Sequence, residues 1–287
     1  MSQKFTPILQ HIIFQIFYFY IFICKHKTKQ VMSKTHDFPT QVIELPSKGL
    51  LYPDGHPLQK GTIEIKYMTA REEDILASQN LIKKGVVLDK LFESIVVEPN
   101  VDINDIFIGD KNAILLATRV LGYGSDYEVE VTDPFTLERQ NVVIDLSKVK
   151  TRDFDENLVN SQNRYVYTLP TSKKEIEFKL LTHGDEVEIN NEIQAKQRLY
   201  KGKVEVDFNV TTRLRYMILS VDGNDDRKFV NNWVENGFIA LDTRKFRNHV
   251  NSISPDMDLK FEFTSEITGE TEALDIPFGV SFFYPSN

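Results

Sequence analysis

The ten residues IEIKYMTARE, 63–72, return in altered form as IEFKLLTHGD, residues 176–185. In both copies apolar residues alternate with Glu and Lys up to a Thr, which is the period of a half-buried strand. Three residues after the Thr comes Glu72 or Asp185, the spacing of a capping box that satisfies free backbone N–H groups at a helix start. Each copy therefore predicts a strand that runs into a helix. Four of the seven positions in 63–69 are identical in 176–182, which indicates a duplicated architecture.

A second repeat ends each half of the chain. Residues 129–138 read VEVTDPFTLE and residues 261–270 read FEFTSEITGE, with four of the ten positions identical. Alternating apolar and polar residues on both sides of each turn predict a β-hairpin. We therefore predict an α+β fold of two related units, each with a β-hairpin, a helical segment and a second β-hairpin.

The helical segments are indicated by apolar stripes and by Gly stop signals. We expect one helix from Thr69 to Gly85, a second over 88–98 and a third over 110–121 that ends at Gly122. In the second half, apolar residues predict a further helix that carries Leu214, Met217, Ile218 and Val221.

At 287 residues the chain is long enough for roughly two domains. We expect the first α+β unit in residues 32–150 and the second in residues 164–287. The polar stretch 151–163 lacks a sustained apolar period, which predicts a linker.

Residues 1–31 contain an apolar run of 17 residues, 8–24, that is followed by a basic cluster. This length is at the lower limit for a membrane span, and a signal peptide would carry its charges before the run. The segment is either an anchor that holds the body on the cytoplasmic side, or upstream translation from a misassigned start, because Met32 opens a polar segment. In both cases we expect it to be no part of the fold.

The composition is that of a soluble globular protein, with 26% charged and 41% hydrophobic residues and a net charge of −8. Without residues 1–31 the chain has 30 basic and 42 acidic residues, a net charge of −12. Such acidity disfavours nucleic-acid binding, which needs a positive surface. The single cysteine is Cys24, so we predict no disulfide and no thiolate metal site in the body.

No local pattern predicts catalysis, a cofactor or a metal. The carboxylates of residues 72–74 point in different directions on a helix, so helix capping explains them better than a paired-acid site. Residues 222–226 resemble the start of a calcium loop, but Arg227 replaces the Gly and Trp233 replaces the bidentate Glu. None of the body histidines is spaced i, i+4 on one helix: His36, His56, His183 and His249. We therefore predict that the protein is not an enzyme.

Three segments, LPSKGLLYP (45–53), MTAREEDIL (68–76) and LIKKG (81–85), resemble the baseplate hub assembly proteins of T-even-type contractile-tailed phages. Residues 215–223 and 282–285 are also similar to segments of that family. The resemblance covers most of residues 39–285. It implies a structural or assembly protein of the baseplate hub that contacts other hub and tail proteins. It also implies a location in the virion tail baseplate, or in the host cytoplasm during assembly.

In this family the two hairpin turns can carry C-x-x-C knuckles, so the resemblance implies zinc-ribbon-like hairpins. The matching positions are Asp133 and Thr136 in one turn, and Ser265 and Thr268 in the other. Because none is a cysteine, we expect no thiolate zinc site, and we expect hydrogen bonds and strand pairing to hold each turn.

A wide loop, residues 47–60, occurs only in the first half, since the second half has a short turn after Leu169-Pro170. This asymmetry makes the loop our candidate partner-binding site, although an ordinary variable surface loop is the alternative. Its candidate contact residues are Lys48, Leu50, Tyr52 and His56.

Two other functions remain open from the sequence. One is a degenerate zinc-ribbon-like nucleic-acid-binding module, and the other is a membrane-anchored scaffold if residues 1–31 are a true anchor. For the body itself we expect neither a nucleic-acid nor a membrane partner.

Overall fold

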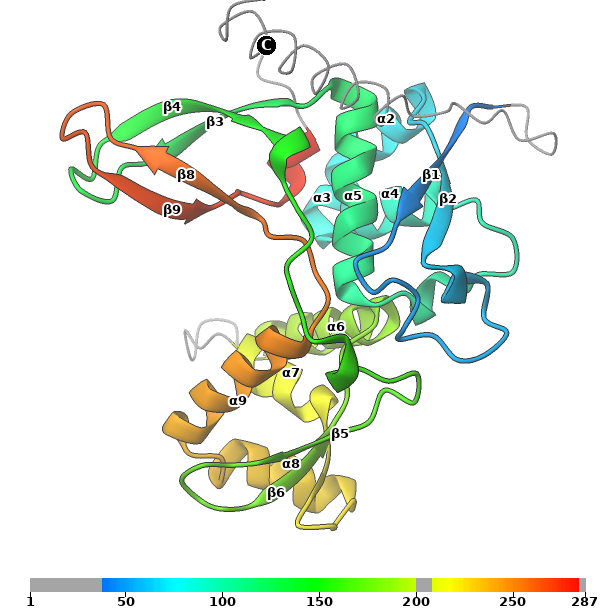
Figure 1. Cartoon of the computed structure of the whole chain (residues 1–287), viewed down its shortest axis with the longest axis vertical. Helices are drawn as coiled ribbons and strands as arrows, with labels where there is room; N and C mark the ends of the chain where they lie inside the picture. The colour runs from blue at the N-terminus through cyan, green and yellow to red at the C-terminus, as the bar shows by residue number, and fades with distance from the viewer. Residues whose placement is uncertain (1–37, 200–207, 284–287) are drawn as a thin grey trace, which may run out of the picture. The chain divides into compact units, whose positions relative to one another are not determined.

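A computed structural model of the chain describes residues 38–199 and 208–283 (Figure 1). Helices alternate with small antiparallel sheets, which confirms the predicted α+β class. Among the described residues, those from 42 onward belong to one compact unit, which takes in the second predicted unit, the segment 151–163 and the first predicted unit from residue 42. The apolar run in residues 1–31 lies outside the described residues, and within them no helix has the length and apolarity to cross a membrane.

The described strands form three two-stranded sheets and one three-stranded sheet, all antiparallel where the register is given. They are β1 (Thr40–Glu44) with β2 (Thr62–Lys66), β3 (Asp126–Thr132) with β4 (Arg139–Asp145), β5 (Tyr165–Thr168) with β6 (Glu175–Phe178) and β7 (Ile218–Val221), and β8 (Lys260–Thr264) with β9 (Thr271–Asp275).

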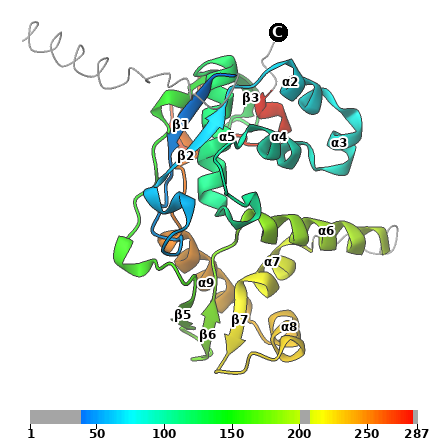
Figure 2. The ribbon, with the colours of Figure 1, turned by 90° about the vertical axis from the view of Figure 1, so that its right-hand side faces the viewer.

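The helices lie between these hairpins in the sequence (Figure 2). The first half contains α2 (Ala70–Ala77), α3 (Gln79–Lys84), α4 (Val87–Ile95) and α5 (Ile108–Tyr123), and the second half contains α6 (His183–Leu199), α7 (Asn209–Met217), α8 (Arg227–Asn236) and α9 (Ala240–Ile253). Short 3₁₀ helices are η1 (Pro57–Lys60), η2 (Ile103–Asp105), η3 (Leu146–Lys148), η4 (Glu156–Leu158) and η5 (Val280–Phe283).

The prediction of one helix over residues 214–221 is wrong for its second part. Helix α7 ends at Met217, and the next four residues form β7, which pairs with β6 (Figure 2). Ile218 and Val221 are fully buried there. The backbone of residues 218–221 can pair with the open edge of β6, whereas backbone groups at a helix end lack such partners. The β-branched residues Ile218 and Val221 also fit the pleated surface of a sheet. Apolar spacing alone could not separate these two outcomes.

The helix predicted from Thr69 to Gly85 is two helices, α2 and α3, because Ser78 between them is extended (φ −69°, ψ 102°). Gly85 does end α3 as predicted, with the left-handed φ of 69°. Helix α5 continues through Gly122 to Tyr123, and Gly124 is its C-cap. Met68 packs over Gly122, because a Cβ at this position would lie 2.2 Å from Met68 Cε, the movable end of that side chain.

Buried apolar side chains form one connected core that runs through both predicted halves. The start of α5 and the β6–α6 junction are also joined through the backbone. The N–H of His183 donates to the carbonyl of Ile106 at 2.7 Å, and the N–H of Ile108 donates to the carbonyl of Leu181 at 3.2 Å. The start of the predicted linker is also joined through the backbone to a distant segment: Arg152 N donates to Asp256 O at 2.8 Å.

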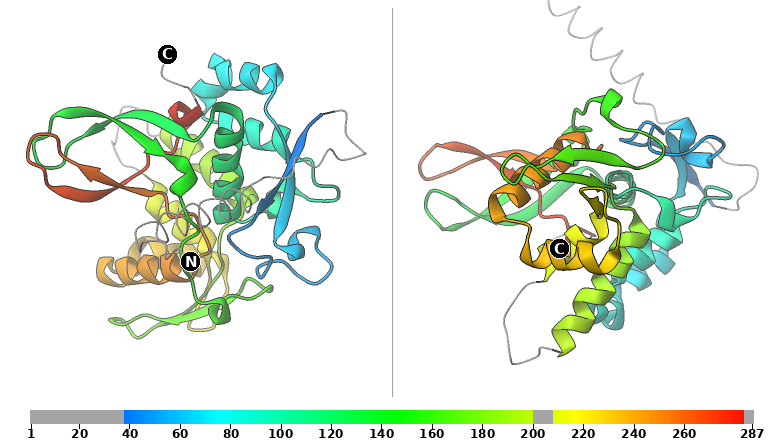
Figure 3. Two further views of the ribbon diagram at one scale, coloured as in Figure 1. Left: turned by 45° about the horizontal axis from the view of Figure 1, so that its top comes forward. Right: turned by 90° about the horizontal axis from the view of Figure 1, so that it is seen from below.

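The β3–β4 and β8–β9 hairpins lie side by side, and we call them together the hairpin arm, residues 126–145 and 260–275 (Figure 3). Val131 and Phe263 are buried, and the side-chain amide of Gln140 bonds to Thr264 O and Glu266 N. At the start of the arm, the buried guanidinium of Arg119 donates to three carbonyl oxygens, those of Gly124, Asp126 and Phe282.

Candidate functional site

The two repeated strand-to-helix junctions are built from matching contacts. Thr69 N and Oγ1 donate to Glu72 Oε2 at 2.9 and 2.7 Å, and Thr182 N and Oγ1 donate to Asp185 Oδ2 at 3.1 and 3.4 Å. Both predicted capping boxes are confirmed. Sequence reasoning missed a further contact that the repeat contains: a Lys three residues before each Thr bonds to the same carboxylate, at 2.7 Å for Lys66 and 2.6 Å for Lys179.

The carboxylates at 72–74 form no paired-acid site. Glu72 is fully buried, whereas Glu73 and Asp74 are exposed. Burial alone would raise the pKa of Glu72, but hydrogen bonds from Lys66, Ser94 and Thr69 outweigh it and hold the pKa at about 2. Glu72 therefore stays ionised and acts in helix capping.

The wide loop is anchored from inside by Asp110, in the first turn of α5. Ser47 donates to the Asp110 carboxylate from its N–H (2.9 Å) and from its hydroxyl (2.7 Å), and the hydroxyl of Tyr52 donates at 2.7 Å. The Asp110 side chain is buried, and this burial, partly offset by the three hydrogen bonds, raises its pKa to about 6. The loop is thus held by specific bonds to a helix, unlike a freely variable surface loop.

The four predicted contact residues have different roles in this loop. Tyr52 is only 3% exposed, so its ring is not available to a partner, which corrects our expectation for this residue. His56 stacks on Tyr52, with ring centroids 4.8 Å apart, and its Nδ1 accepts from Leu58 N. Lys48 is exposed and forms an ion pair with Glu156, and Leu50 is partly exposed. Lys48, Leu50 and the partly exposed His56 therefore have surface that a partner could contact.

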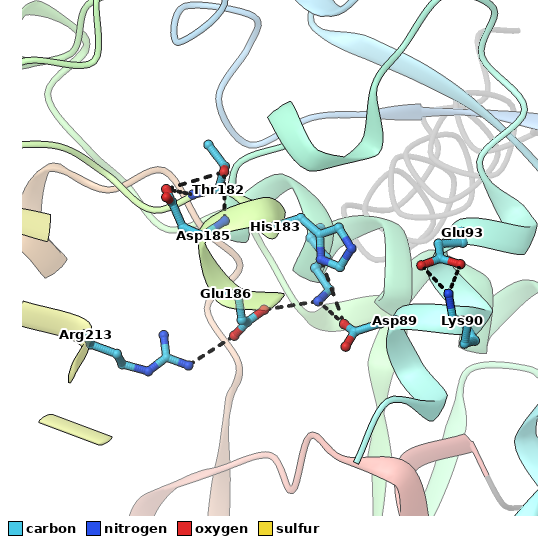
Figure 4. A network of polar contacts seen from close by, with 9 residues as sticks. Asp89, Lys90, Glu93, Thr182, His183, Asp185, Glu186 and Arg213 are labelled. Carbon is cyan, nitrogen blue, oxygen red and sulfur yellow. Dashed lines mark hydrogen bonds and ion pairs between the residues drawn. The ribbon is translucent and has the colours of Figure 1, made fainter. Parts of the chain in front are cut away.

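A largely buried charge network joins four helices around Lys111 of α5, and Figure 4 labels its other members, Asp89, Glu186 and Arg213. Lys111 Nζ lies 2.9 Å from Asp89 Oδ1 on α4 and 3.0 Å from Glu186 Oε2 on α6. Glu186 in turn accepts from Arg213 on α7 at 3.1 Å. Burial would raise the pKa of Glu186, but Lys111 and Arg213 outweigh it and lower the pKa. The network pairs opposite charges, which is the condition for keeping them buried.

His183 lies beside this network, with Nδ1 3.8 Å from Asp89 Oδ1 (Figure 4). Burial, together with the positive charge of Lys111, lowers the pKa of His183, so the imidazole is neutral near pH 7. In the described part of the chain, no group of three or more His, Cys, Asp or Glu side chains is placed to hold a metal ion. The network therefore resembles a structural junction between helices.

The two turns at the end of the hairpin arm have the same internal bonds. Asp133 Oδ1 accepts from the N–H groups of Phe135 and Thr136, and Ser265 Oγ accepts from the equivalent groups at 267 and 268. The turns also bond to each other, because Ser265 Oγ donates to Asp133 Oδ2 at 2.6 Å. Hydrogen bonding and strand pairing hold each turn, as expected, and the contact between the turns is an addition that the sequence did not reveal.

The surface of these turns is apolar at its tip, which we define as residues 133–138 and 265–270. Leu137 is 78% exposed, Ile267 is 63% exposed and Phe135 is 38% exposed. Exposed apolar side chains gathered at one place mark interaction sites more often than scattered ones do. The tip was not among our sequence candidates, although the matching turns had been recognised.

The hairpin arm also holds most of the excess negative charge. It contains 11 of the 42 acidic residues but only 2 of the 34 basic residues, a net charge of −9. The rest of the chain has 31 acidic and 32 basic residues and is nearly neutral. The acidity is thus a local property of the arm, and a general solubility effect does not explain it.

Comparisons of the chain with protein-family models, curated proteins and solved structures give no match.

Proposed function

We propose that this protein is a structural or assembly component of a phage contractile-tail baseplate hub and that it acts by protein–protein contacts. The observation that carries the proposal is the arm tip, where three apolar side chains are exposed on two turns that hydrogen-bond to each other. Holding apolar groups in place before binding lowers the entropic cost of binding a partner. The resemblance of residues 39–285 to baseplate hub assembly proteins supplies the kind of partner, namely other hub and tail proteins.

This function is tested by interrupting the reading frame well downstream of Met32, at residue 60, in the phage that carries it. We expect lysates with filled heads but without complete contractile tails in electron micrographs, and expression of residues 32–287 from a plasmid should restore the tails. Normal tails in the interrupted phage would contradict the proposal. Filled heads in the same lysates are the internal control, since a general defect in late gene expression would remove heads as well as tails.

The finer description of the fold, two related units with zinc-ribbon-like end hairpins, is part of the same proposal. Three matching features support it: the strand-to-helix junctions, the end turns, and the pairing of β6 with β7. The pairing of β6 with β7 has a short counterpart in the first half, where Ile65 of β2 pairs with Val96 after α4. In the repeat alignment Ile65 matches Phe178, which pairs with Ile218 after α7.

The start of the first hairpin loop agrees with this duplication. Leu45 N donates to Gly61 O just before β2, and Leu169 N donates to Lys174 O just before β6. Both leucines are buried. The wide loop is therefore an insertion between two equivalent anchor points, and specific binding is best sought where the two units differ.

Zinc uptake by a variant with four cysteines tests the zinc-ribbon description. The changes are Asp133→Cys, Thr136→Cys, Ser265→Cys and Thr268→Cys. Since Asp133 and Ser265 touch at 2.6 Å, four thiolates should surround one zinc ion, with Zn–S distances of about 2.3 Å. We expect one zinc per chain and the absorption bands of tetrahedral thiolate coordination with cobalt. The control variant, Asp133→Cys with Thr136→Cys alone, should bind zinc far more weakly. Equal zinc uptake by the two variants would mean that the two turns do not form one zinc site.

A further inference from the structure

A groove lies between α7 and α9, on a different part of the chain from the arm. It encloses about 590 Å³, and its apolar lining is Leu181, Val210, Leu214, Met217 and Val250. Three arginines also line it, Arg213, Arg244 and Arg247, together with the amides of Asn209, Asn248 and Asn251. We call this the basic groove. No Asp or Glu is among its described lining residues.

Two of these arginines have no ion-pair partner in the described part of the chain. Arg213 is paired with Glu186, but Arg244 and Arg247 are exposed on α9 and make no ion pair within residues 38–199 and 208–283. Uncompensated guanidinium groups above an apolar floor suit a ligand with an apolar centre and carboxylates at its edge, because Arg binds carboxylates with two parallel hydrogen bonds.

The arm tip has this chemistry. Leu137 and Ile267 are its exposed apolar groups, and Glu138, Glu266 and Glu270 lie next to them in the sequence of the turns. None of these three glutamates has an ion pair in the described part of the chain. The arm carries a net charge of −9, and the rest of the chain is nearly neutral. The two surfaces are therefore complementary in both charge and polarity.

We propose that the basic groove binds the arm tip of a second copy of this chain, so that copies associate head to tail. The apolar side chains of the tip occupy the groove floor, and the glutamates pair with Arg244 and Arg247. Such a contact joins two different surfaces, so it leaves one tip and one groove open in each pair and can continue into a ring or a filament. The proposal rests on the proposed function, for which it supplies one partner.

Charge reversal on each surface tests the contact by sedimentation of residues 32–287. The groove variant is Arg244→Glu with Arg247→Glu, and the tip variant is Glu266→Lys with Glu270→Lys. We expect the unmodified chain to associate with increasing concentration and to dissociate with added salt. Each variant alone should associate about tenfold or more weakly.

Mixing the two variants gives the sharper result, because each still carries one intact surface. A mixture of equal amounts should recover association, because the intact tip of one variant meets the intact groove of the other and the two reversed surfaces are themselves opposite in charge. Two matched controls reverse equal numbers of charges elsewhere: Lys228→Glu with Lys245→Glu outside the groove, and Glu262→Lys with Glu272→Lys on the arm strands. Both controls should associate within about twofold of the unmodified chain.

Three results would overturn the proposal. A chain that stays monomeric at all concentrations has no such contact, and a groove variant that self-associates as strongly as the unmodified chain shows that the groove is not the contact. A tip variant with unchanged association shows that another part of the chain, or another occupant, fills the groove. The tail assay reports on the proposed function separately, so a monomeric chain that still supports tail assembly would remove only the head-to-tail contact.

Discussion

Replacing Lys111 by methionine is expected to destabilise the fold by about 3 kcal/mol, because the change leaves two carboxylates without their common partner. Lys111 is 6% exposed and lies within 3.0 Å of both Asp89 and Glu186. Methionine keeps the length and apolar stem of the side chain, so the loss reports on the charge rather than on packing. The measurement is urea unfolding at neutral pH.

Lys90 provides the matched control for this change. It lies on α4, near the same network, but its ion pair with Glu93 is exposed (Figure 4). Lys90→Met should cost no more than about 0.5 kcal/mol, the usual contribution of an exposed helix pair. Adding Glu186→Gln to Lys111→Met should cost less than the two single changes together, because both act on one network. Equal and small effects of Lys111→Met and Lys90→Met would mean that the network adds nothing to the fold.

Replacing Asp110 by alanine is expected to cost about 3 kcal/mol and to release the wide loop. The change leaves the N–H and hydroxyl of Ser47 and the hydroxyl of Tyr52 without their acceptor, and an unsatisfied buried group costs about 1–3 kcal/mol. Asp105, which is exposed in η2, is the control, and Asp105→Ala should change stability by less than about 0.5 kcal/mol. Proteolysis within residues 47–60 should accelerate only for Asp110→Ala.

The Asp110 carboxyl group should also make the unfolding free energy depend on pH. The folded-state pKa of Asp110, about 6, lies above its ordinary value of 3.8, so the folded chain holds this proton more tightly than the unfolded chain does. The stabilisation from Asp110 is therefore complete below pH 3.8 and is lost as the pH rises through 6. In Asp110→Asn this dependence should disappear. The difference in unfolding free energy between the two proteins, measured from about pH 4 to pH 8, should change by about 2–3 kcal/mol; a constant difference would contradict the assignment.

Local sequence patterns predicted the elements whose contacts are themselves local. Both capping boxes join residues three positions apart, and the hairpins of the arm join strands that are adjacent in the chain. The signals in these stretches are strand alternation, cap spacing and turn residues, all of which act over a few residues. The repeat strengthened each prediction, because the same pattern occurred twice.

The remaining features depend on contacts between distant residues. Tyr52 looked like an exposed loop residue because nothing in 47–60 indicates Asp110, which is 58 positions away. Residues 218–221 became a strand because β6 offered an edge, and the apolar stripe alone could not show that edge. One signal for the network was present: Lys111 lies at the start of α5, whose residues 113–117 are all apolar, and a Lys on a buried helix needs a partner.

The most direct test of the central claim, that this protein acts through contacts made by its arm, uses Leu137→Ser with Ile267→Ser in the tail assay. Both side chains are more than 60% exposed, so the unfolding free energy should stay within about 0.5 kcal/mol of the unmodified chain. We expect this variant, supplied from a plasmid to the interrupted phage, to leave filled heads without complete tails. Normal numbers of complete tails with the variant would contradict it.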